Sequence, residues 1–586
     1  MFIIFAINKE LKTRMNKKIN KLLKKRIKSL RKEQKELYDK LQTETLLQAC
    51  YPCGFGKGYV MCTDILNQIV NTNEQILAIL SHRINLNDQH ISEIFESLLP
   101  ITGEVAFLFI GHDGGLNIDK KINTEFNKNL FYYNNKLPQS EKITKGTLYK
   151  KTTNAVELNE FINTHISKRK IVIVSTYHSC GLLSSINHTI GTVYCDEAHE
   201  LASTFKETNE SKSFMKSYFK ILAKRKFFFT ATPKDCSDDP TDTNLMNNHK
   251  IFGERIGMKH VEVMNEGYVL PCNITILSPT YYNNNFNQSY DSIMNKAYYI
   301  SESFDYNYDW LRKVSYYPDK IASKLLVKCS NVVEEMWPVF FKLIELRKDI
   351  KIFASASKNK DGKQVSTNII YQNGEELYFN TSENKFVKKG SIPIDRKSYL
   401  KALKSLKDNE PAIVLHFDTL SEGINVPGFT CLVIMSETLI GFAKLYQNFG
   451  RPIRLNERDK KLLAEGKIKV GDPTGWIKPE AQLIIPYWNS VSDSAQKSMV
   501  KKLIHIQTIT GSSLNIEIPN GSSIPTGSGI VDTIKPSYTD NRIQNVDELT
   551  FVEKLSREIL LSQKNNLIKE IQDLSITEQL NYLDSI

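Results

Sequence analysis

Short apolar runs alternate with longer helical patterns along most of this 586-residue chain, and the alternation appears twice. We expect buried strands in the first half at 76–80, 106–110, 171–174, 192–195 and 227–229. We expect a second set at 325–327, 352–354, 412–415, 431–434 and 483–485. Strands that alternate with helices form parallel sheets covered by helices on both faces. The chain is therefore predicted to be an α/β protein with two tandem, doubly wound parallel-sheet domains.

The two sets of strands divide the chain into four expected segments. Residues 1–45 form a basic helical N-terminal arm, and residues 46–271 form the first domain. Residues 272–490 form the second domain, and residues 491–586 are a C-terminal extension in which we find no motif. Glycine, serine and proline cluster at 511–529, which is typical of a linker or a surface loop.

Composition excludes several classes of protein. The chain is 41% hydrophobic and 24% charged, as ordinary globular proteins are. No apolar run approaches the roughly 18 residues of a membrane-spanning helix, and residues 1–7 lack the flanks of a signal peptide. Nine irregularly spaced cysteines argue against a disulfide framework and for a reducing compartment. We therefore expect a cytoplasmic protein with no membrane partner. Its frequent Lys, Asn and Ile indicate an AT-rich genome, with a virus or a plasmid as a candidate source.

The positive charge of the chain is concentrated in the arm. The net charge is +12, and residues 1–40 hold 14 basic and 4 acidic side chains, a local balance of +10. Apolar residues recur there at helical spacing: Ile19, Leu22, Leu23, Ile27, Leu30, Leu37 and Leu41. Two interpretations stay open. The arm binds nucleic acid phosphates, or it is a solvated helix that docks its apolar face on the body, while membranes and partner proteins also bind such helices.

A glycine-rich turn at 52–58 precedes an expected helix. Glycine lets backbone N–H groups close around phosphate oxygens, and the helix N-terminus adds its positive dipole end. Gly54, Gly56 and Gly58 would bind a nucleotide here, and Lys57 would reach its β- and γ-phosphates. The turn departs from the usual pattern because Gly58 replaces the Ser or Thr that ligates Mg²⁺. Taken alone, the turn is also compatible with an ordinary loop.

An apolar strand ends in two adjacent carboxylates at 193–199, with the sequence VYCDEAH. Asp196 can hold Mg²⁺, directly or through water, and Glu197 can orient a water molecule on the γ-phosphate. The alternative is a strand that ends in acidic residues by chance. His199, taken alone, is more often a structural histidine.

Together these two motifs resemble those of superfamily 2 helicases of the DEAH-box kind, and further motifs of that family follow in order. The matching segments are 79–89 with Arg83, 174–178 with Thr176, 229–233 with Thr230 and Thr232, 419–427 with Thr419, Gly423 and Asn425, and 447–454 with Gln447, Arg451 and Arg454. Asn425 stands where Asp is commoner in the family. The segments 252–253 and 265–271 are most similar to the branch of restriction-enzyme motors and phage or viral helicases.

The resemblance implies two RecA-like domains that use ATP and Mg²⁺, and it implies a role for each matching residue. The catalytic set would be Lys57, Asp196, Glu197, Gln447, Arg451 and Arg454, with Asp196 as the metal ligand. Gly423 and Asn425 would bind the nucleotide together with Gly54, Gly56 and Gly58. His199, Thr230 and Thr232 would couple the nucleotide state to nucleic acid binding, and Arg83, Thr176 and Thr419 would contact the nucleic acid.

The predicted function is therefore an ATP-dependent nucleic acid helicase or translocase that moves along or unwinds DNA, with RNA as the open alternative. One alternative is an ATP-binding nucleic acid clamp, because Gly58 removes a metal ligand. Another is the motor subunit of a restriction-type complex. Its nuclease would be a separate subunit, because the sequence holds no convincing nuclease motif and the nearest approach to one is 395–397. A nuclease, polymerase or transcription partner would bind through the N-terminal arm or the C-terminal extension.

Overall fold

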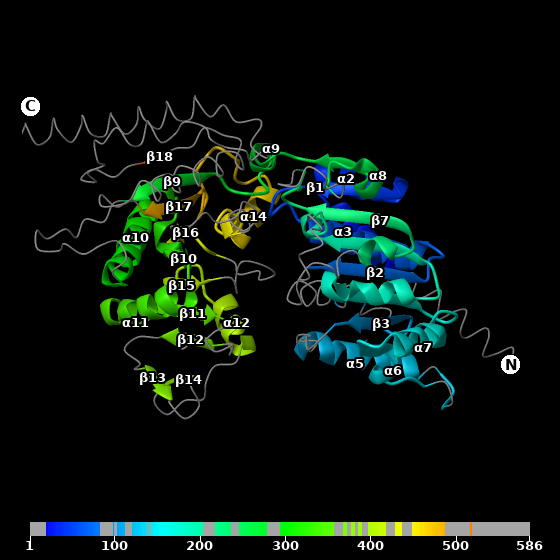
Figure 1. Ribbon diagram of the computed structural model, residues 1–586. Coiled ribbons are helices and arrows are strands. Elements are labelled where there is room, and N and C mark those ends of the chain that lie inside the picture. The colour runs from blue at the N-terminus through cyan, green and yellow to red at the C-terminus, as the bar shows by residue number, and fades with distance from the viewer. Residues whose placement is uncertain are drawn as a thin grey trace, which may run out of the picture. The chain divides into compact units, whose positions relative to one another are not determined.

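The computed structural model describes residues 19–82, 96, 98, 102–111, 120–135, 137–139, 142–202, 217–235, 245–277, 293–356, 367–371, 377–380, 385–388, 396–417, 428–435, 448–486 and 516–517. The described residues fall into two compact units that divide between Met258 and Lys259. Each unit contains an eight-stranded sheet with helices lying against it (Figure 1). Among the described residues, no helix combines the length and the hydropathy that a bilayer crossing needs.

The sheet of the first unit is entirely parallel. Its strand order is β4-β3-β5-β2-β6-β7-β1-β8. The strands are β1 (Leu46–Cys50), β2 (Ile76–Ser81), β3 (Val105–Ile110), β4 (Tyr149–Thr152), β5 (Lys170–Thr176), β6 (Ile190–Asp196), β7 (Ala223–Thr230) and β8 (Glu254–Gly257). Strands β2 and β3 are buried along their whole length, as expected for a sheet covered on both faces. All five strands expected in the first half are confirmed.

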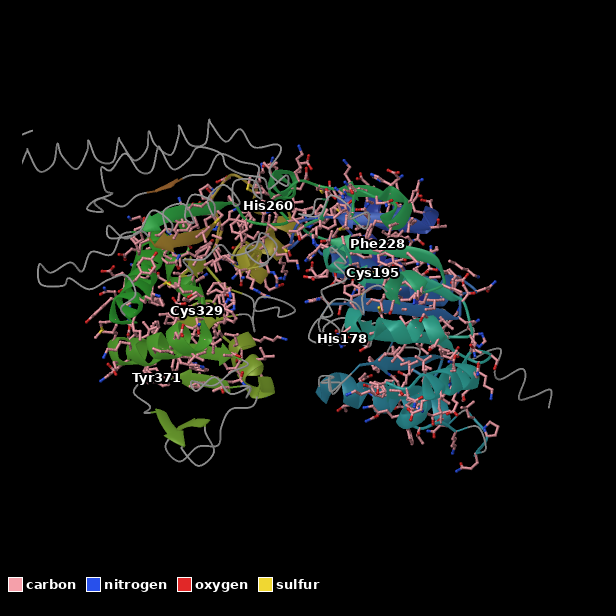
Figure 2. All side chains as sticks on the ribbon, in the orientation of Figure 1. His178, Cys195, Phe228, His260, Cys329 and Tyr371 are labelled. Atoms are coloured by element: carbon pink, nitrogen blue, oxygen red, sulfur yellow. The ribbon has the colours of Figure 1, made fainter. Side chains whose placement is uncertain are left out.

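Helices connect these strands and cover the sheet. They are α2 (Lys32–Thr43), α3 (Lys57–Asn71), α5 (Lys120–Asn134), α6 (Lys145–Leu148), α7 (Ala155–His165) and α8 (His249–Phe252), with short 3-10 turns η3 (Tyr177–Ser185) and η4 (Ala198–Glu200). Cys195 of β6 and Phe228 of β7 are register partners in the core of this unit (Figure 2). Parallel strands place their carboxyl ends at one edge, and the expected chemical motifs lie at that edge.

A second sheet of the same type forms the other unit. Its order is β12-β11-β15-β10-β16-β17-β9-β18, and every neighbouring pair is parallel except β11 with β12. The strands are β9 (Cys272–Leu277), β10 (Lys324–Lys328), β11 (Lys351–Ala356), β12 (Thr367–Tyr371), β15 (Ala412–His416), β16 (Cys431–Ile434), β17 (Ala481–Pro486) and β18 (Ile516–Glu517). A separate hairpin joins β13 (Leu377–Asn380) to β14 (Lys385–Lys388). All five strands expected in the second half are confirmed.

The helices of the second unit follow the same alternation with its strands. They are α9 (His260–Asn265), α10 (Ile293–Val314), the π-helical turn η7 (Val332–Met336), α11 (Trp337–Leu346), α12 (Arg396–Lys404) and α14 (Glu457–Ala464), with a 3-10 turn η6 (Pro318–Lys320). The core between α10, α11 and the sheet contains the fully buried Trp337 and Phe340.

The N-terminal arm docks on the first unit through its apolar face. Residues 19–29 and helix α2 are helical. Ile19, Leu37 and Leu41 are at most 1% exposed, whereas Lys21 and Lys24 face solvent. For residues 19–43 the structure therefore agrees with the docking-helix interpretation, while the exposed lysines leave a charged outer face.

The segment that follows the first unit packs with the second. Leu270 donates its backbone N–H to the carbonyl oxygen of Ile453 at 2.7 Å, and Val269 forms an antiparallel bridge with Arg454. The compact units consequently divide at 258/259, whereas the motif pattern predicted a join at residue 272.

Candidate functional site

The glycine-rich turn connects β1 to α3 and requires glycine at two positions. Gly54 and Gly56 have φ values of 91° and 93°, in the left-handed region that side chains disfavour. Gly56 caps α3, and a Cβ atom there would lie 2.7 Å from Nε2 of Gln34. Gln34 uses that same amide nitrogen to donate to the carbonyl oxygen of Phe55 at 2.7 Å. The turn is thus shaped by its own glycines and by α2, a contact that no motif in the sequence indicated.

The first turn of α3 suits an anion. The helix begins at Lys57, and its internal bonding starts when Val60 donates its N–H to the carbonyl oxygen of Gly56 at 3.2 Å. The N–H groups before Val60 therefore lie at the positive end of a 15-residue helix. Nζ of Lys57 donates to the carbonyl oxygens of Tyr51 at 2.6 Å and Pro52 at 3.2 Å. The ammonium group thus lies over the same turn, and the residues present fit phosphate groups.

Gly58 is half-buried in this helical turn, and no hydroxyl of α3 replaces the one it lacks. The next threonine hydroxyl in α3, that of Thr63, donates to the carbonyl oxygen of Tyr59 at 2.7 Å and accepts from Nε of Arg26 at 3.3 Å. Thr63 is fully buried. A metal ion beside the turn would therefore take oxygen ligands from Asp196, water and phosphate rather than from α3.

Asp196 and Glu197 lie where β6 ends, and both are partly exposed. Glu197 has φ 51° and ψ 48°, and it is the only non-glycine with a positive φ in the part of the chain that the structure describes. Such strain costs on the order of 1–3 kcal/mol and clusters at functional sites. The hydroxyl of Tyr177 donates to the carbonyl oxygen of Asp196 at 2.7 Å, and this hydrogen bond fixes the backbone directly before Glu197.

His199 connects this turn to the end of β7. Its Nδ1 lies 3.0 Å from the hydroxyl oxygen of Thr230 and 3.5 Å from Oε2 of Glu197. Burial lowers the pKa of His199 to about 4, although Glu200 and Asp196 raise it, so the imidazole is neutral at pH 7. Thr230 also accepts the backbone N–H of Thr232 at 3.1 Å. One buried, hydrogen-bonded group therefore joins the three residues expected to couple the nucleotide state to nucleic acid binding, which are His199, Thr230 and Thr232.

The β1–α3 turn and the carboxylates lie at the same edge of the sheet. Cys50 is the register partner of Thr230, and Asp196 is the register partner of Phe229. The backbone N–H of Tyr51 donates to the carbonyl oxygen of Thr230 at 3.1 Å. Strand β7 lies between β1 and β6, so the ends of those two strands are roughly 10 Å apart. The glycine-rich turn and the carboxylates are therefore two strand spacings apart at one edge of the sheet.

Thr176 ends β5 at the same edge, but its side chain is buried. It is 8% exposed, and its hydroxyl donates to Oγ of Ser179 at 3.4 Å.

The second unit carries the two arginines in a short turned segment. Arg451 is 5% exposed, and Arg454 is half-buried and donates its backbone N–H to the carbonyl oxygen of Arg451 at 3.3 Å. Lys478, which no motif in the sequence indicated, donates from Nζ to the carbonyl oxygens of Pro452 and Phe429, both at 2.8 Å. Lys478 thus ties the arginine segment to a residue shortly before β16.

Five residues of the expected site lie outside the described residues. They are Arg83, Thr419, Gly423, Asn425 and Gln447. Within the described residues, no group of three or more His, Cys, Asp or Glu side chains is arranged to hold a metal ion. The single protein ligand expected for Mg²⁺, Asp196, does not require such a group.

Comparison with known proteins gives one family match and a set of structural likenesses. Residues 16–235 match the family model of the type III restriction enzyme res subunit. The ATP-dependent type ISP restriction-modification enzyme LlaBIII bound to DNA is 13% identical, with a TM-score of 0.52 over 84% of this chain and 31% of that chain. The Mycobacterium smegmatis helicase Lhr bound to ssDNA and AMP-PNP is 11% identical, with a TM-score of 0.40 over 83% of this chain and 44% of that chain. No curated protein sequence matches this chain.

The likeness to the LlaBIII enzyme bears on the fold, and the family match bears on the first unit. The chain spans less than a third of the length of the LlaBIII enzyme. The two parallel sheets confirm the predicted α/β class, and the match in fold shows two tandem RecA-like domains. Over residues 16–235, which include the glycine-rich turn and both carboxylates, the chain is similar to the res subunit of type III restriction enzymes.

Proposed function

We propose that this protein is an ATP-dependent nucleic acid translocase or helicase. The observation that carries the proposal is the carboxyl edge of the first sheet, where the β1–α3 turn with Lys57 and the strained Glu197 lie on either side of the end of β7. The family match over residues 16–235 supports the same proposal.

The chemistry assigned to each residue follows from its place. Bound ATP would supply the γ-phosphoryl group, and Mg²⁺ would neutralise charge on the β- and γ-phosphates. The first turn of α3 and Lys57 would hold the phosphate oxygens, and Asp196 would hold the metal ion, directly or through water. Glu197 would orient the attacking water and accept its proton. Its left-handed backbone ends the extended conformation of β6 at this residue.

The second domain would complete the site. Arg451 and Arg454 would neutralise charge that develops on the transferred group, with Gln447, Gly423 and Asn425 as further contacts. Arg451 and Arg454 belong to the second unit, whereas Lys57 and Glu197 belong to the first. Hydrolysis would therefore depend on closure of the two domains around ATP, and this closure would drive movement along a strand.

We propose DNA rather than RNA as the substrate, with Arg83 and Thr419 contacting the strand. Thr176 would join them by exchanging its hydrogen bond with Ser179 for one to the strand. His199, Thr230 and Thr232 would report the nucleotide state to these contacts. Within the superfamily 2 helicases, we assign this protein to the DEAH-box type and to the branch of restriction-enzyme motors and phage or viral helicases. The match to a res subunit favours one specific version, a restriction-type motor that works with a separate nuclease.

Phosphate release from ATP and Mg²⁺ tests this proposal directly. A malachite-green assay should be run without nucleic acid and with single-stranded DNA, duplex DNA and RNA. We expect hydrolysis that single-stranded DNA stimulates. Binding of ATP and DNA without phosphate release would instead identify the clamp that Gly58 first suggested.

A further inference from the structure

Glu200 lies between two histidines at the carboxyl edge of the first sheet. Its Oε2 is 3.8 Å from Nδ1 of His82, and its Oε1 is 3.6 Å from Nε2 of His199. Both distances are longer than a hydrogen bond, so a small movement of the carboxylate can shorten either one. His82 and Glu200 are 28% and 25% exposed, whereas His199 is 8% exposed.

The three residues come from adjacent strands. His82 directly follows β2, and His199 and Glu200 form the turn after β6. Strands β2 and β6 are hydrogen-bonded neighbours, with Leu80 and Cys195 in register. Since His199 also contacts Thr230 at 3.0 Å, a polar chain crosses the ends of β7, β6 and β2.

The neutral imidazole of His199 cannot satisfy both of its acidic neighbours. Glu197 lies 3.5 Å from Nδ1, and Glu200 lies 3.6 Å from Nε2. A neutral imidazole carries one N–H, so it donates to one side while the other nitrogen accepts. The arrangement therefore has two states: with the N–H on Nδ1, His199 donates toward Glu197 and Thr230, and with the N–H on Nε2 it donates toward Glu200 while Nδ1 accepts from the Thr230 hydroxyl. An element with two discrete arrangements is what coupling between distant contacts requires.

We propose that Glu200 and His82 are positioning residues that link the turn at Glu197 to the segment beginning at Arg83. This inference rests on the proposed function, because it assigns a route by which nucleic acid binding and ATP hydrolysis influence each other. When His199 donates toward Glu200, the carboxylate turns from His82. When the N–H is on Nδ1, Nε2 offers Glu200 no hydrogen, and the carboxylate turns toward His82. His82 is the residue directly before that segment in the sequence.

Three variants separate this route from a simple structural contact. Glu200→Gln keeps the size of the side chain but removes its charge. His82→Leu removes the partner, and His82→Lys places an ammonium group facing Glu200. A matched control is the surface pair of His249 and Glu254 in the same unit, 3.4 Å apart and 51% and 82% exposed, changed by Glu254→Gln.

The experiment compares basal and DNA-stimulated phosphate release and, separately, the affinity for AMP-PNP with and without oligothymidylate. We expect Glu200→Gln and His82→Leu to keep the basal rate but lose at least about fivefold of the stimulation and of the affinity change, which are reciprocal measures of one coupling. His82→Lys should recover part of both, and Glu254→Gln should change neither. A merely structural role would lower basal and stimulated rates together.

Two results would overturn the inference while leaving the proposed function intact. One is full stimulation in both Glu200→Gln and His82→Leu. The other is a wild-type protein that hydrolyses ATP without any change in AMP-PNP affinity on adding oligothymidylate. Conversely, if the wild-type protein shows that affinity change and the variants lose it, but no phosphate is released, the inference stands and the proposed hydrolysis fails.

Discussion

Lys478→Met tests how the segment that carries Arg451 and Arg454 is held. Lys478 is 1% exposed, and its Nζ donates to the carbonyl oxygens of Phe429 and Pro452, both at 2.8 Å. Burial lowers its pKa from 10.5 to about 7. The nearby cations Lys324 and Arg454 lower the pKa further, whereas the carboxylates of Asp459 and Asp408 raise it. Methionine has a similar length and no charge, so the substitution removes the amine with little change in volume.

The free energy of unfolding at one pH does not decide this test, because two effects oppose each other. Loss of the amine leaves two buried carbonyl oxygens without this donor, at about 1–3 kcal/mol each. Loss of the charge removes a desolvation cost that the lowered pKa shows to be of comparable size. The pH dependence decides instead, because only the wild-type protein has an amine that titrates.

The sign of that dependence follows from the two pKa values. The unfolded chain keeps the proton up to about pH 10.5, while the folded chain loses it near pH 7. Between these limits the unfolded state binds more protons, so wild-type stability rises with pH. The rise from this group is about 1.4 kcal/mol per pH unit, or about 2 kcal/mol between pH 7 and about pH 9. Lys478→Met should lack this contribution.

Urea unfolding followed by tryptophan fluorescence isolates the relevant unit. The four tryptophans are Trp310, Trp337, Trp476 and Trp488, all in the sequence after Lys259. Lys467→Met is the control, because Lys467 is 65% exposed and pairs with Glu465 on the surface. The free energy of unfolding of the wild-type protein and of Lys467→Met should rise between pH 7 and about pH 9 relative to that of Lys478→Met. The same dependence of the free energy of unfolding on pH in all three proteins would refute a lowered pKa at Lys478.

Two further predictions concern the first unit. Tyr194→Phe removes a hydroxyl that donates to the fully buried Asp64 at 2.6 Å, so thermal unfolding followed by circular dichroism should show a loss of about 2 kcal/mol; an unchanged midpoint would mean that Gln42 and Gln68 satisfy Asp64 without it. Gly58→Thr adds the missing hydroxyl beside the proposed Mg²⁺ site, so a Mg²⁺ titration of hydrolysis should show a lower half-saturating concentration and an equal or higher rate. Loss of all activity in Gly58→Thr would mean that the turn has no room for a side chain.

Most of the fold was predictable because buried parallel strands are short, continuous apolar runs. Strand β1 was not among the expected strands, since its apolar run is interrupted by Gln48. In the structure Gln48 is fully buried, and its amide donates to the carbonyl oxygens of Met246 at 2.7 Å and Gly253 at 2.9 Å. Partners about two hundred residues away have no local signal. Strand β12 was missed for a different reason, because it lies at the sheet edge within a polar stretch.

The candidate site was predictable only where its residues are contiguous. Lys57, Asp196 and Glu197 stand in short motifs at strand ends, and the structure places those ends at one edge. Gln34 and Lys478 belong to no recognisable motif, because each acts by contacting the backbone of a turn that is distant in sequence. The left-handed backbone of Glu197 could not be predicted either, because the identity of a non-glycine residue does not indicate a positive φ.

The arm shows what composition leaves open. Its charge and its helical periodicity suited nucleic acid binding and docking equally. Burial of Leu37 and Leu41, together with the cation–π contact of Arg26 over the ring of Tyr59 at 4.3 Å, shows how it docks.

The most direct test of the central claim is the rate of phosphate release by Glu197→Gln with saturating single-stranded DNA. The wild-type protein should hydrolyse ATP, and DNA should stimulate it. Glu197→Gln should bind ATP as tightly as the wild-type protein but release phosphate at least about 10²-fold more slowly, because the group that accepts the proton of water is gone. A Glu197→Gln protein that releases phosphate at the wild-type rate would contradict the assignment of this site.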